Sequence, residues 1–428
     1  MNYLTMSNND LYKERLLILA QYEKLKDLNL SLNMARGKPS PEQVALSKEL
    51  LNTVHSESKC ISEDGIDCLN YGALDGLADL KEIFAPVMGI KKEQIFVGGN
   101  SSLSLMFDVI SLFMTHGVCG YTPWSKQDKI KFLCPCPGYD RHFAILNYFN
   151  IEAIPIMMTS TGPDMNVVEG LVAADSAIKG IWCVPKYSNP QGITCSDETV
   201  RRFAALKPLA PDFRIFWDNA YAIHDLTDTP VSLLNLMDEC EKNSTQDLPI
   251  IFCSTSKITF PGSGIAFLGA SAENLALIKQ MYSFKTIGFD KVNQLRHARY
   301  LRDYQHMLSH MKRHREILKP KFDVVISTLR NNFSDNKIIS FTEPAGGYFV
   351  SVDVMSGCAK RVVELCKNVG LILTDAGATF PNGIDKNDSN IRLAPSYPSV
   401  SELQNAMKVF CVCVKLATLE KLLKSSHL

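Results

Sequence analysis

Residues 253–264 read Cys-Ser-Thr-Ser-Lys-Ile-Thr-Phe-Pro-Gly-Ser-Gly and directly follow an apolar run at residues 248–252. A short apolar run bounded by polar residues, glycine and proline is typical of a buried strand that ends in a loop. Lys257 is therefore expected just beyond the carboxyl end of a strand, where open α/β sheets bind ligands. A lysine among small hydroxyl residues at this place is either a Schiff-base nucleophile or a solvated loop residue.

The composition is that of a globular protein without a charge bias. Of the 428 residues 46% are hydrophobic, and 45 Lys+Arg balance 45 Asp+Glu, which gives no electrostatic reason to expect nucleic acid or an anionic membrane as partner. The thirteen scattered cysteines contain no CxxC pair and are interpreted as buried free thiols, which favours a reducing, cytoplasmic compartment. The polar first ten residues predict no secretory signal, and no apolar run is long enough to span a bilayer.

Strand-like runs alternate with helical stretches through the middle of the chain. This alternation predicts βαβ units and an α/β fold with a mostly parallel, seven-stranded sheet. The last run follows the one before it too closely for a helical crossover, so it is expected to run antiparallel. The predicted strands cover residues 94–97, 131–134, 153–158, 180–184, 214–217, 250–253 and 265–268.

The two ends of the chain are expected to build a smaller α+β domain together. An amphipathic helix is predicted over residues 11–28, followed by a loop that contains Gly37 and a short helix that opens at Ser40 or Pro41. The C-terminal part is predicted to hold two helices and three short strands. The expected divisions are an N-terminal helix and arm at 1–66, a large domain at 67–305 and a C-terminal small domain at 306–428.

A strongly basic helical stretch over residues 291–318 is expected to stop near Pro320. It lacks interleaved aromatic residues, so a solvated connecting helix is favoured over a nucleic-acid-binding face. His306, His310 and His314 share one face of this helix, which is a spacing that can bind a metal ion. The glutamate of a metalloprotease motif is absent, and we expect no metal site.

Polar side chains follow the ends of several predicted strands. Ser101 and Ser102 open a helix after a glycine pair, where they either bind an anion or only cap the helix. Tyr139 follows another strand and either stacks on a planar ligand or belongs to the core. Asn189 is held extended by the proline after it, so its amide either bonds a ligand or belongs to a simple turn.

Two charged residues lie within apolar strands. Asp218 ends a strand three residues before Tyr221, and a buried carboxylate there needs a partner such as a protonated pyridine nitrogen, unless it caps a helix. Arg392 is predicted either to grip a carboxylate or phosphate bidentately or to form an ion pair between elements. Both residues are expected to face the same crevice as Lys257.

Taken in order, these residues resemble the fold-type I pyridoxal-phosphate aminotransferases of class I over residues 33–396. Phrases at residues 35–39, 137–141, 254–260 and 293–297 are similar to the divergent class Ic aspartate aminotransferases. The resemblance rests on Gly37, Tyr71, Ser101-Ser102, Tyr139, Asn189-Pro190-x-Gly192, Asp218-x-x-Tyr221, Ser254-x-Ser256-Lys257 and Arg392.

This resemblance implies pyridoxal 5'-phosphate as the cofactor, an amino acid and a 2-oxo acid as substrates, and a homodimer. Lys257 would form the Schiff base and move the proton, and Asp218 would keep the cofactor ring nitrogen protonated. Tyr221 and Asn189 would hydrogen-bond the phenolic oxygen of the cofactor, and Tyr139 would stack on its ring.

The expected contacts with substrate and phosphate also follow from the resemblance. Arg392 would bind the substrate α-carboxylate, with Gly37 lying over it and with Asn189 near it. Most class I members hold the phosphate with an arginine where this chain has Ser263-Gly264. The candidates for the phosphate contacts are therefore Ser101, Ser102, Ser254, Ser256 and Tyr71 of a partner subunit. It also implies a cis peptide bond between Asn189 and Pro190.

The favoured activity is transamination of aspartate with 2-oxoglutarate, which needs a cation for the distal carboxylate. Arg141 is the first candidate, because it lies two residues after Tyr139, and Arg36 and Lys38 are alternatives. The other interpretations are an aminotransferase for aromatic amino acids, alanine or kynurenine, and a carbon–sulfur lyase. A non-catalytic pyridoxal-phosphate sensor is less favoured, since only 36 residues precede Gly37, too few for a DNA-binding domain.

Overall fold

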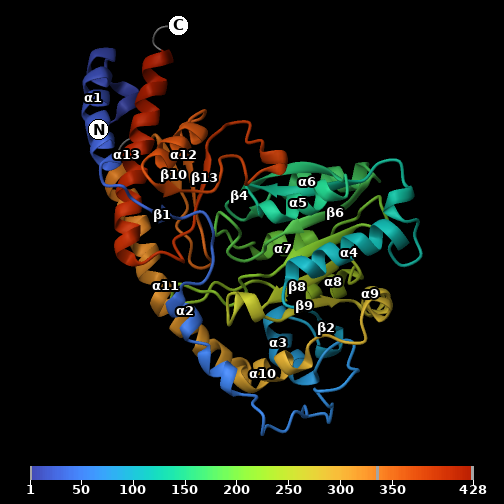
Figure 1. Cartoon of the computed structure of the whole chain (residues 1–428). Helices are drawn as coiled ribbons and strands as arrows, with labels where there is room; N and C mark the ends of the chain where they lie inside the picture. Colours follow the sequence, from blue (N-terminus) through green and yellow to red (C-terminus); the bar gives the residue numbers. More distant parts are fainter. Residues whose placement is uncertain (1, 334–336, 426–428) are drawn as a thin grey trace.

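A mixed, eight-stranded sheet forms the centre of the protein, in the order β2-β9-β8-β7-β6-β3-β4-β5 (Figure 1). The computed structural model describes residues 2–333 and 337–425. The strands of this sheet are β2 (Ile95–Val97), β3 (Lys131–Cys136), β4 (Glu152–Thr159), β5 (Gly162–Pro163), β6 (Ile178–Cys183), β7 (Arg214–Asp218), β8 (Pro249–Ser254) and β9 (Ala266–Ala270).

All seven predicted strands are present in this sheet. Strands β3, β4, β6, β7 and β8 run parallel to one another, whereas β9 is antiparallel to β8, as expected from the short connection between them. The prediction of seven strands missed β5, which pairs antiparallel with β4 at the sheet edge. A two-residue strand is too short to show a hydrophobic period, and its Gly-Pro sequence is typical of a turn.

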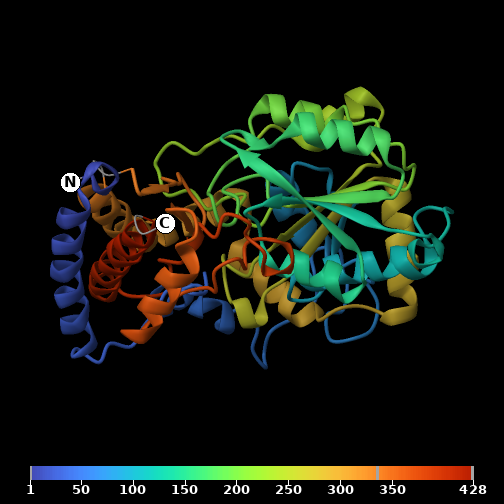
Figure 2. The same ribbon diagram turned by 90° about the horizontal axis from the view of Figure 1, so that it is seen from above.

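Helices cover both faces of the sheet and give three layers (Figure 2). One face packs against helices α4 (Ser102–His116), α5 (Asp140–Tyr148) and α9 (Ala272–Lys285). The other face packs against helices α3 (Ala78–Met88), α6 (Met165–Ala174), α7 (Asp197–Ala204) and α8 (Leu236–Asn243). Because helices fill both faces, the strands are buried along most of their length, which explains their nearly continuous apolar sequences.

A separate hydrophobic core joins the two ends of the chain. Helix α1 (Asn8–Lys26) lies beside α13 (Val400–Ser425) in both views (Figures 1 and 2). The same core contains α12 (Ala359–Asn368) and the antiparallel sheet of β10 (Ile339–Phe341), β11 (Val350–Val354) and β13 (Asn390–Leu393). Strand β1 (Leu32–Asn33) pairs with β12 (Leu371–Ile372) in parallel. The domain divisions at 66/67 and 305/306 stay a prediction.

The basic helical stretch differs from the prediction in its bounds. It consists of α10 (Lys291–Leu301) and α11 (Tyr304–Phe333), which are separated where Arg302 adopts a left-handed backbone conformation with φ 59°. Helix α11 continues through Pro320, although a proline inside a helix costs about 3 kcal/mol. Burial of apolar residues on both sides of the proline, such as Leu318 and Phe322, offsets this cost.

Short elements complete the chain, and Ser40 caps α2 (Pro41–Ala45) as expected. Single turns of 3₁₀ helix lie at Tyr3–Thr5, Lys48–Asn52, Lys92–Gln94, Trp124–Lys126, Pro261–Ser263 and Pro381–Gly383. All thirteen cysteines are free, and all but Cys119 are buried, which confirms their interpretation as thiols of the interior. Within residues 2–333 and 337–425, no helix is long and apolar enough to cross a membrane.

Candidate active site

Two neighbouring parallel strands, β7 and β8, bring Asp218 and Lys257 to the same edge of the sheet. Strand β7 ends on Asp218, and Lys257 follows three residues after the end of β8. The Lys257 Nζ lies 5.2 Å from the centroid of the Tyr221 ring and 5.9 Å from that of Tyr348. Desolvation lowers the pKa of Lys257, against the opposing effect of the Asp218 carboxylate. A lowered pKa increases the fraction of neutral, nucleophilic amine.

Only one of the two carboxylate oxygens of Asp218 has a hydrogen-bond partner among the described residues. Its Oδ2 lies 3.0 Å from His142 Nε2, whereas its buried Oδ1 has no hydrogen-bond partner among the described residues. The His142 ring is stacked on Trp182 at 4.3 Å, and Tyr139 approaches its edge at 5.0 Å. The sequence analysis missed His142, whose signal was only a histidine three residues after Tyr139. A buried, open carboxylate oxygen requires a donor, so this position can accept a cationic N–H group.

Ser101 and Ser102 lie at the N-terminus of α4. The backbone of Gly99 accepts a 2.7 Å hydrogen bond from Ala266, which pairs with Ser254 across β8 and β9, so the loop before α4 lies beside the end of β8. Ser101 is the N-cap residue of α4, but its side chain makes no capping bond. At the end of β8, Ser254 Oγ donates to Ser256 Oγ at 3.1 Å. Free N–H groups and hydroxyls at one helix N-terminus are suited to bind an anion.

Arg392 of β13 meets the polar groups of three other segments. Its Nη1 lies 2.8 Å from Asp140 Oδ1 and 3.3 Å from Asn189 Oδ1, and its Nη2 lies 3.4 Å from Thr374 Oγ1. The Asn189–Pro190 peptide bond is cis, as predicted. The Arg392 Nε is buried and has no hydrogen-bond partner among the described residues. An arginine held in this way keeps part of its guanidinium available to a ligand carboxylate.

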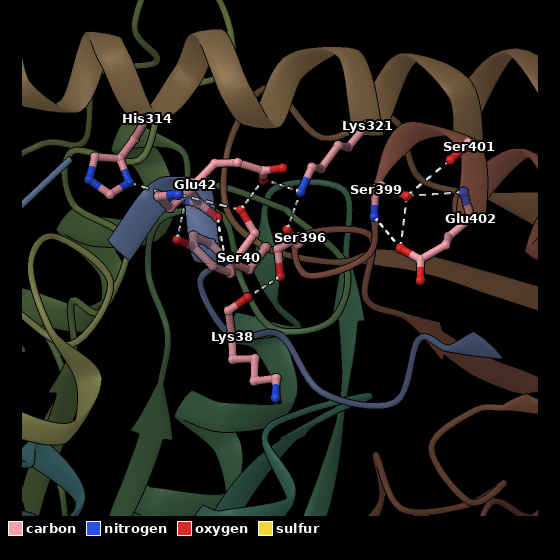
Figure 3. Close-up of polar contacts among 11 residues, drawn as sticks. Lys38, Ser40, Glu42, His314, Lys321, Ser396, Ser399, Ser401 and Glu402 are labelled. Atoms are coloured by element: carbon pink, nitrogen blue, oxygen red, sulfur yellow. Dashed lines mark hydrogen bonds and ion pairs between the residues drawn. The ribbon is translucent and has the colours of Figure 1, made fainter. Parts of the chain in front are cut away.

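The loop that contains Gly37 is packed onto the Arg392 region. A Cβ atom at Gly37 would lie 2.5 Å from Phe349 Cζ, and the Arg392 guanidinium lies 5.0 Å from the centroid of the same ring. Figure 3 shows how the loop is tied down: Ser396 Oγ donates to the Lys38 carbonyl at 2.9 Å, and Lys321 donates to the Ser396 carbonyl at 3.0 Å. The absence of a side chain at Gly37 therefore permits its close approach to Phe349.

Gly37→Ala is expected to raise the KM for a carboxylate substrate about tenfold and to destabilise the protein by about 1–3 kcal/mol, the usual cost of overpacking. The added methyl group displaces the Phe349 ring, which lies against Arg392. Steady-state kinetics and chemical denaturation measure the two effects. The matched control is Gly170→Ala in α6, where a Cβ meets nothing within 4 Å. Equal behaviour of the two variants would contradict this prediction.

Two histidines of α11, His310 and His314, have structural partners. His310 Nε2 lies 2.8 Å from the carbonyl oxygen of Ile258, the residue after Lys257, and 3.0 Å from His314 Nε2. His314 Nδ1 lies 3.1 Å from Gln43 Nε2. These contacts connect α2 and α11 to the Lys257 loop. In the described part of the chain, no group of three or more side chains is arranged to hold a metal ion.

The comparison with protein families agrees with this geometry. A family model described as aspartate amino-transferase matches residues 6–426. The chain belongs to this family. A curated aspartate aminotransferase of Corynebacterium glutamicum is 43% identical to the chain, over 94% of this chain and 93% of its own length.

Solved structures place the aminotransferase in fold-type I. The crystal structure of an aspartate transaminase from Corynebacterium glutamicum superposes with a TM-score of 0.96 at 41% identity, and it covers 98% of this chain and 99% of its own. An α-aminoadipate aminotransferase from Thermus thermophilus, complexed with N-(5'-phosphopyridoxyl)-L-leucine, shares the fold with a TM-score of 0.74 at 19% identity, over 95% of each chain.

Among the described residues, no hydrogen bond or ion pair joins two predicted site residues of the aminotransferase, Tyr71 and Arg141, to Lys257 or Arg392. Tyr71 is 82% exposed on the surface of the subunit. Arg141 lines a surface cavity of about 470 Å³ between α4, α5 and α9, together with Asp108 and Lys285. In the part of the chain that the structure describes, Arg141 forms no hydrogen bond or ion pair with the other predicted site residues. The neighbouring Asp140, which the sequence analysis did not select, contacts Arg392 instead.

In the Ser263-Gly264 segment, the position of Gly264 leaves little room for a side chain. A Cβ at Gly264 would lie 3.0 Å from Thr255 Oγ1 and 3.1 Å from the Phe260 carbonyl oxygen. The Asn293 side chain donates to the carbonyl groups of Ser263 and Gly264, each at 3.2 Å. An arginine at this place would require a different path of the loop. The close packing of the loop therefore agrees with the absence of this arginine in the aminotransferase.

Proposed function

We propose that this aminotransferase transfers the amino group of aspartate to 2-oxoglutarate, giving oxaloacetate and glutamate, with pyridoxal 5'-phosphate as its cofactor. The proposal is supported by a set of linked contacts: the Lys257 Nζ lies 5.2 Å from the Tyr221 ring centroid, and Asp218 and Arg392 contact His142 and Asp140 of the same helix, α5. Lys257, Asp218 and Arg392 supply an amine, an anionic partner for a ring nitrogen and a cationic grip for a carboxylate. The similarity to a Corynebacterium glutamicum aspartate aminotransferase supports the choice of substrate.

The residues fit the proposed cofactor at both of its ends. The open, buried Oδ1 of Asp218 matches a protonated ring nitrogen, and His142 holds the second oxygen of the carboxylate. The cofactor phosphate would be held at the N-terminus of α4 by Ser101 and Ser102, and by Ser254 and Ser256 of the Lys257 loop. The N-terminus of a helix attracts a phosphate through free N–H groups and the helix dipole.

The proposed mechanism assigns the proton transfer to Lys257. When bound, the cofactor supplies an electron sink that stabilises negative charge at the substrate Cα. The Nζ of Lys257, whose pKa is lowered by desolvation, would take up the proton from Cα of aspartate and, in the second half of the reaction, would deliver a proton to the former carbonyl carbon of 2-oxoglutarate. Burial raises the pKa of Tyr221 well above its ordinary value, so its hydroxyl stays protonated and would donate to the phenolic oxygen of the cofactor. Tyr139, beside His142, would cover the ring face.

The substrate α-carboxylate would bind Arg392. Asn189 already contacts the Arg392 Nη1 through its Oδ1, which leaves the Asn189 N–H groups for the substrate or the cofactor. The Phe349 ring lies 5.0 Å from the guanidinium, with Gly37 packed against the same ring, and so limits the access of water to Arg392. This arrangement orients the Cα–H bond of the substrate, because a bidentate contact determines the plane of the carboxylate.

The distal carboxylate of aspartate needs a second cation, and Arg141 remains our first candidate. Arg141→Ala is expected to lower kcat/KM for aspartate about 10²-fold and to leave alanine turnover within about twofold, because only aspartate loses a charged hydrogen bond. Paired assays with the two amino acids measure the difference. Equal activities of variant and wild type with aspartate would exclude Arg141 and leave Arg36, Lys38 and the neighbouring Lys285 to be tested in the same way.

We also propose a homodimer in which Tyr71 of the partner subunit contacts the phosphate. Gly72 and Gly288 are in contact, so the segments around them form one surface. This surface exposes large apolar side chains, which is typical of an interface. The exposed fractions are 73% for Leu69, 82% for Tyr71, 86% for Phe284 and 61% for Ile287. Sedimentation is expected to give twice the chain mass of 47.7 kDa.

The free thiols support a reducing, cytoplasmic location.

A substrate panel tests the proposed activity. The purified protein is assayed with aspartate, alanine and phenylalanine, each with 2-oxoglutarate, and with cystathionine alone. Oxaloacetate formation that depends on aspartate is expected to exceed the other activities. If phenylalanine or alanine is turned over faster than aspartate, that amino acid is the preferred substrate. Release of sulfide or ammonia from cystathionine would indicate a lyase.

A further inference from the structure

Arg392 is already engaged by a carboxylate of its own chain. The distance of 2.8 Å between Arg392 Nη1 and Asp140 Oδ1 is the shortest contact of this guanidinium and its only ion pair among the described residues. The contacts with Asn189 and Thr374 are longer, at 3.3 and 3.4 Å, and their oxygens are uncharged. Asp140 therefore stands where a ligand carboxylate would be expected.

The two partners differ in how firmly they are held. The Arg392 side chain is 7% exposed, whereas that of Asp140 is 35% exposed. Asp140 is the first residue of α5, and in the described residues its carboxylate has no other hydrogen bond. Rotation of its side chain would therefore move the carboxylate into water without breaking any further contact. The Arg392 side chain cannot rotate into water in this way, because it is enclosed by the protein.

A buried arginine without a counter-ion is costly, because its charge loses hydration without gaining a partner. In the empty site, Asp140 supplies this partner. A substrate carboxylate that approaches Arg392 is repelled by Asp140 and can form the strongest contact only after Asp140 has left. Exchange of one carboxylate for another keeps the guanidinium paired throughout.

We propose that Asp140 is a resident carboxylate of Arg392 that the substrate α-carboxylate displaces. It stabilises the empty site, weakens the binding of carboxylates and speeds product release. This inference rests on the proposed function, because it takes Arg392 as the substrate clamp. Asp140 is a positioning residue in this scheme, since it acts on the substrate through Arg392.

The test is the binding of succinate, an unreactive dicarboxylate, to the holoenzyme, measured by isothermal titration calorimetry. Asp140→Asn is expected to lower the Kd for succinate about tenfold, because a like charge next to the ligand is removed. The KM for aspartate is expected to fall in parallel, whereas kcat does not rise. Asp140→Ser serves as a second variant and is expected to shift the Kd in the same direction.

The matched control is Asp175→Asn. Asp175 forms a 2.6 Å ion pair with Lys131, its side chain is 32% exposed, and neither residue belongs to the site described above. This variant is expected to bind succinate like the wild type. An unchanged or raised Kd for both Asp140 variants would overturn the proposal, and a raised Kd for Asp140→Ser alone would show that Asp140 orients Arg392 instead.

Arg392→Gln separates this inference from the proposed function. If Arg392→Gln binds succinate as tightly as the wild type, Arg392 is not the clamp, and the proposed function itself is wrong on this point. If Arg392→Gln loses succinate binding while the Asp140 variants bind no more tightly than the wild type, only the displacement of Asp140 is wrong.

Discussion

Lys257→Ala is expected to lower kcat for transamination by at least about 10³-fold, because it removes both the covalent anchor of the cofactor and the base that moves the Cα proton. The rings of Tyr221 and Tyr348 have centroids 5.2 and 5.9 Å from the Lys257 Nζ, and burial keeps both phenols protonated. Neither can replace a base at neutral pH. A coupled assay of oxaloacetate formation measures the loss, and the visible absorbance of the protein is expected to disappear after dialysis.

Lys257→Arg is the control for the charge of the side chain. Arginine keeps the positive charge but does not lose its proton in proteins, so the loss of activity is expected to be equally large. Retention of more than a tenth of the wild-type kcat in either variant would show that Lys257 is not the catalytic amine.

Asp218→Asn is expected to lower kcat about 10²- to 10³-fold, the usual cost of removing a group that stabilises charge in an active site. Asparagine has the same shape but no charge, so it cannot keep a ring nitrogen protonated. It also leaves His142 Nε2 without its anionic partner at 3.0 Å. The cofactor is expected to bind more weakly, which a titration of the apoenzyme with pyridoxal 5'-phosphate measures.

Asp212→Asn is the control variant, and it is expected to lower the stability of the protein rather than its kcat. Asp212 is also buried, but it pairs with Lys179 at 2.7 Å and accepts a hydrogen bond from Trp124. Removal of its charge leaves Lys179 buried and unpaired, which is expected to destabilise the protein by about 3–5 kcal/mol. The kcat of the folded fraction is expected to stay near that of the wild type. If Asp218→Asn behaved in the same way, its role would be structural.

Much of the large sheet was predictable from the sequence alone. Each strand from β2 to β9, except β5, is an apolar run bounded by glycine, proline or polar residues, and such a pattern is local. The antiparallel direction of β9 followed from the short connection at residues 255–265. Local patterns were less reliable at Pro320, where apolar residues on both sides of the proline keep α11 continuous through long-range packing.

The sequence by itself determined which chemical groups stand at the strand ends and in which order they follow one another, because strand ends are marked by local residue types. Only the tertiary structure decided the partners of these groups. His142 lies 76 residues from Asp218, and Asp140 lies 252 residues from Arg392. Such contacts depend on how α5 and β13 pack against the sheet edge, which no local pattern encodes. For the same reason, the two neighbours Asp140 and Arg141 have different surroundings: Asp140 pairs with Arg392, whereas Arg141 lines a surface cavity, although the sequence alone favoured the arginine.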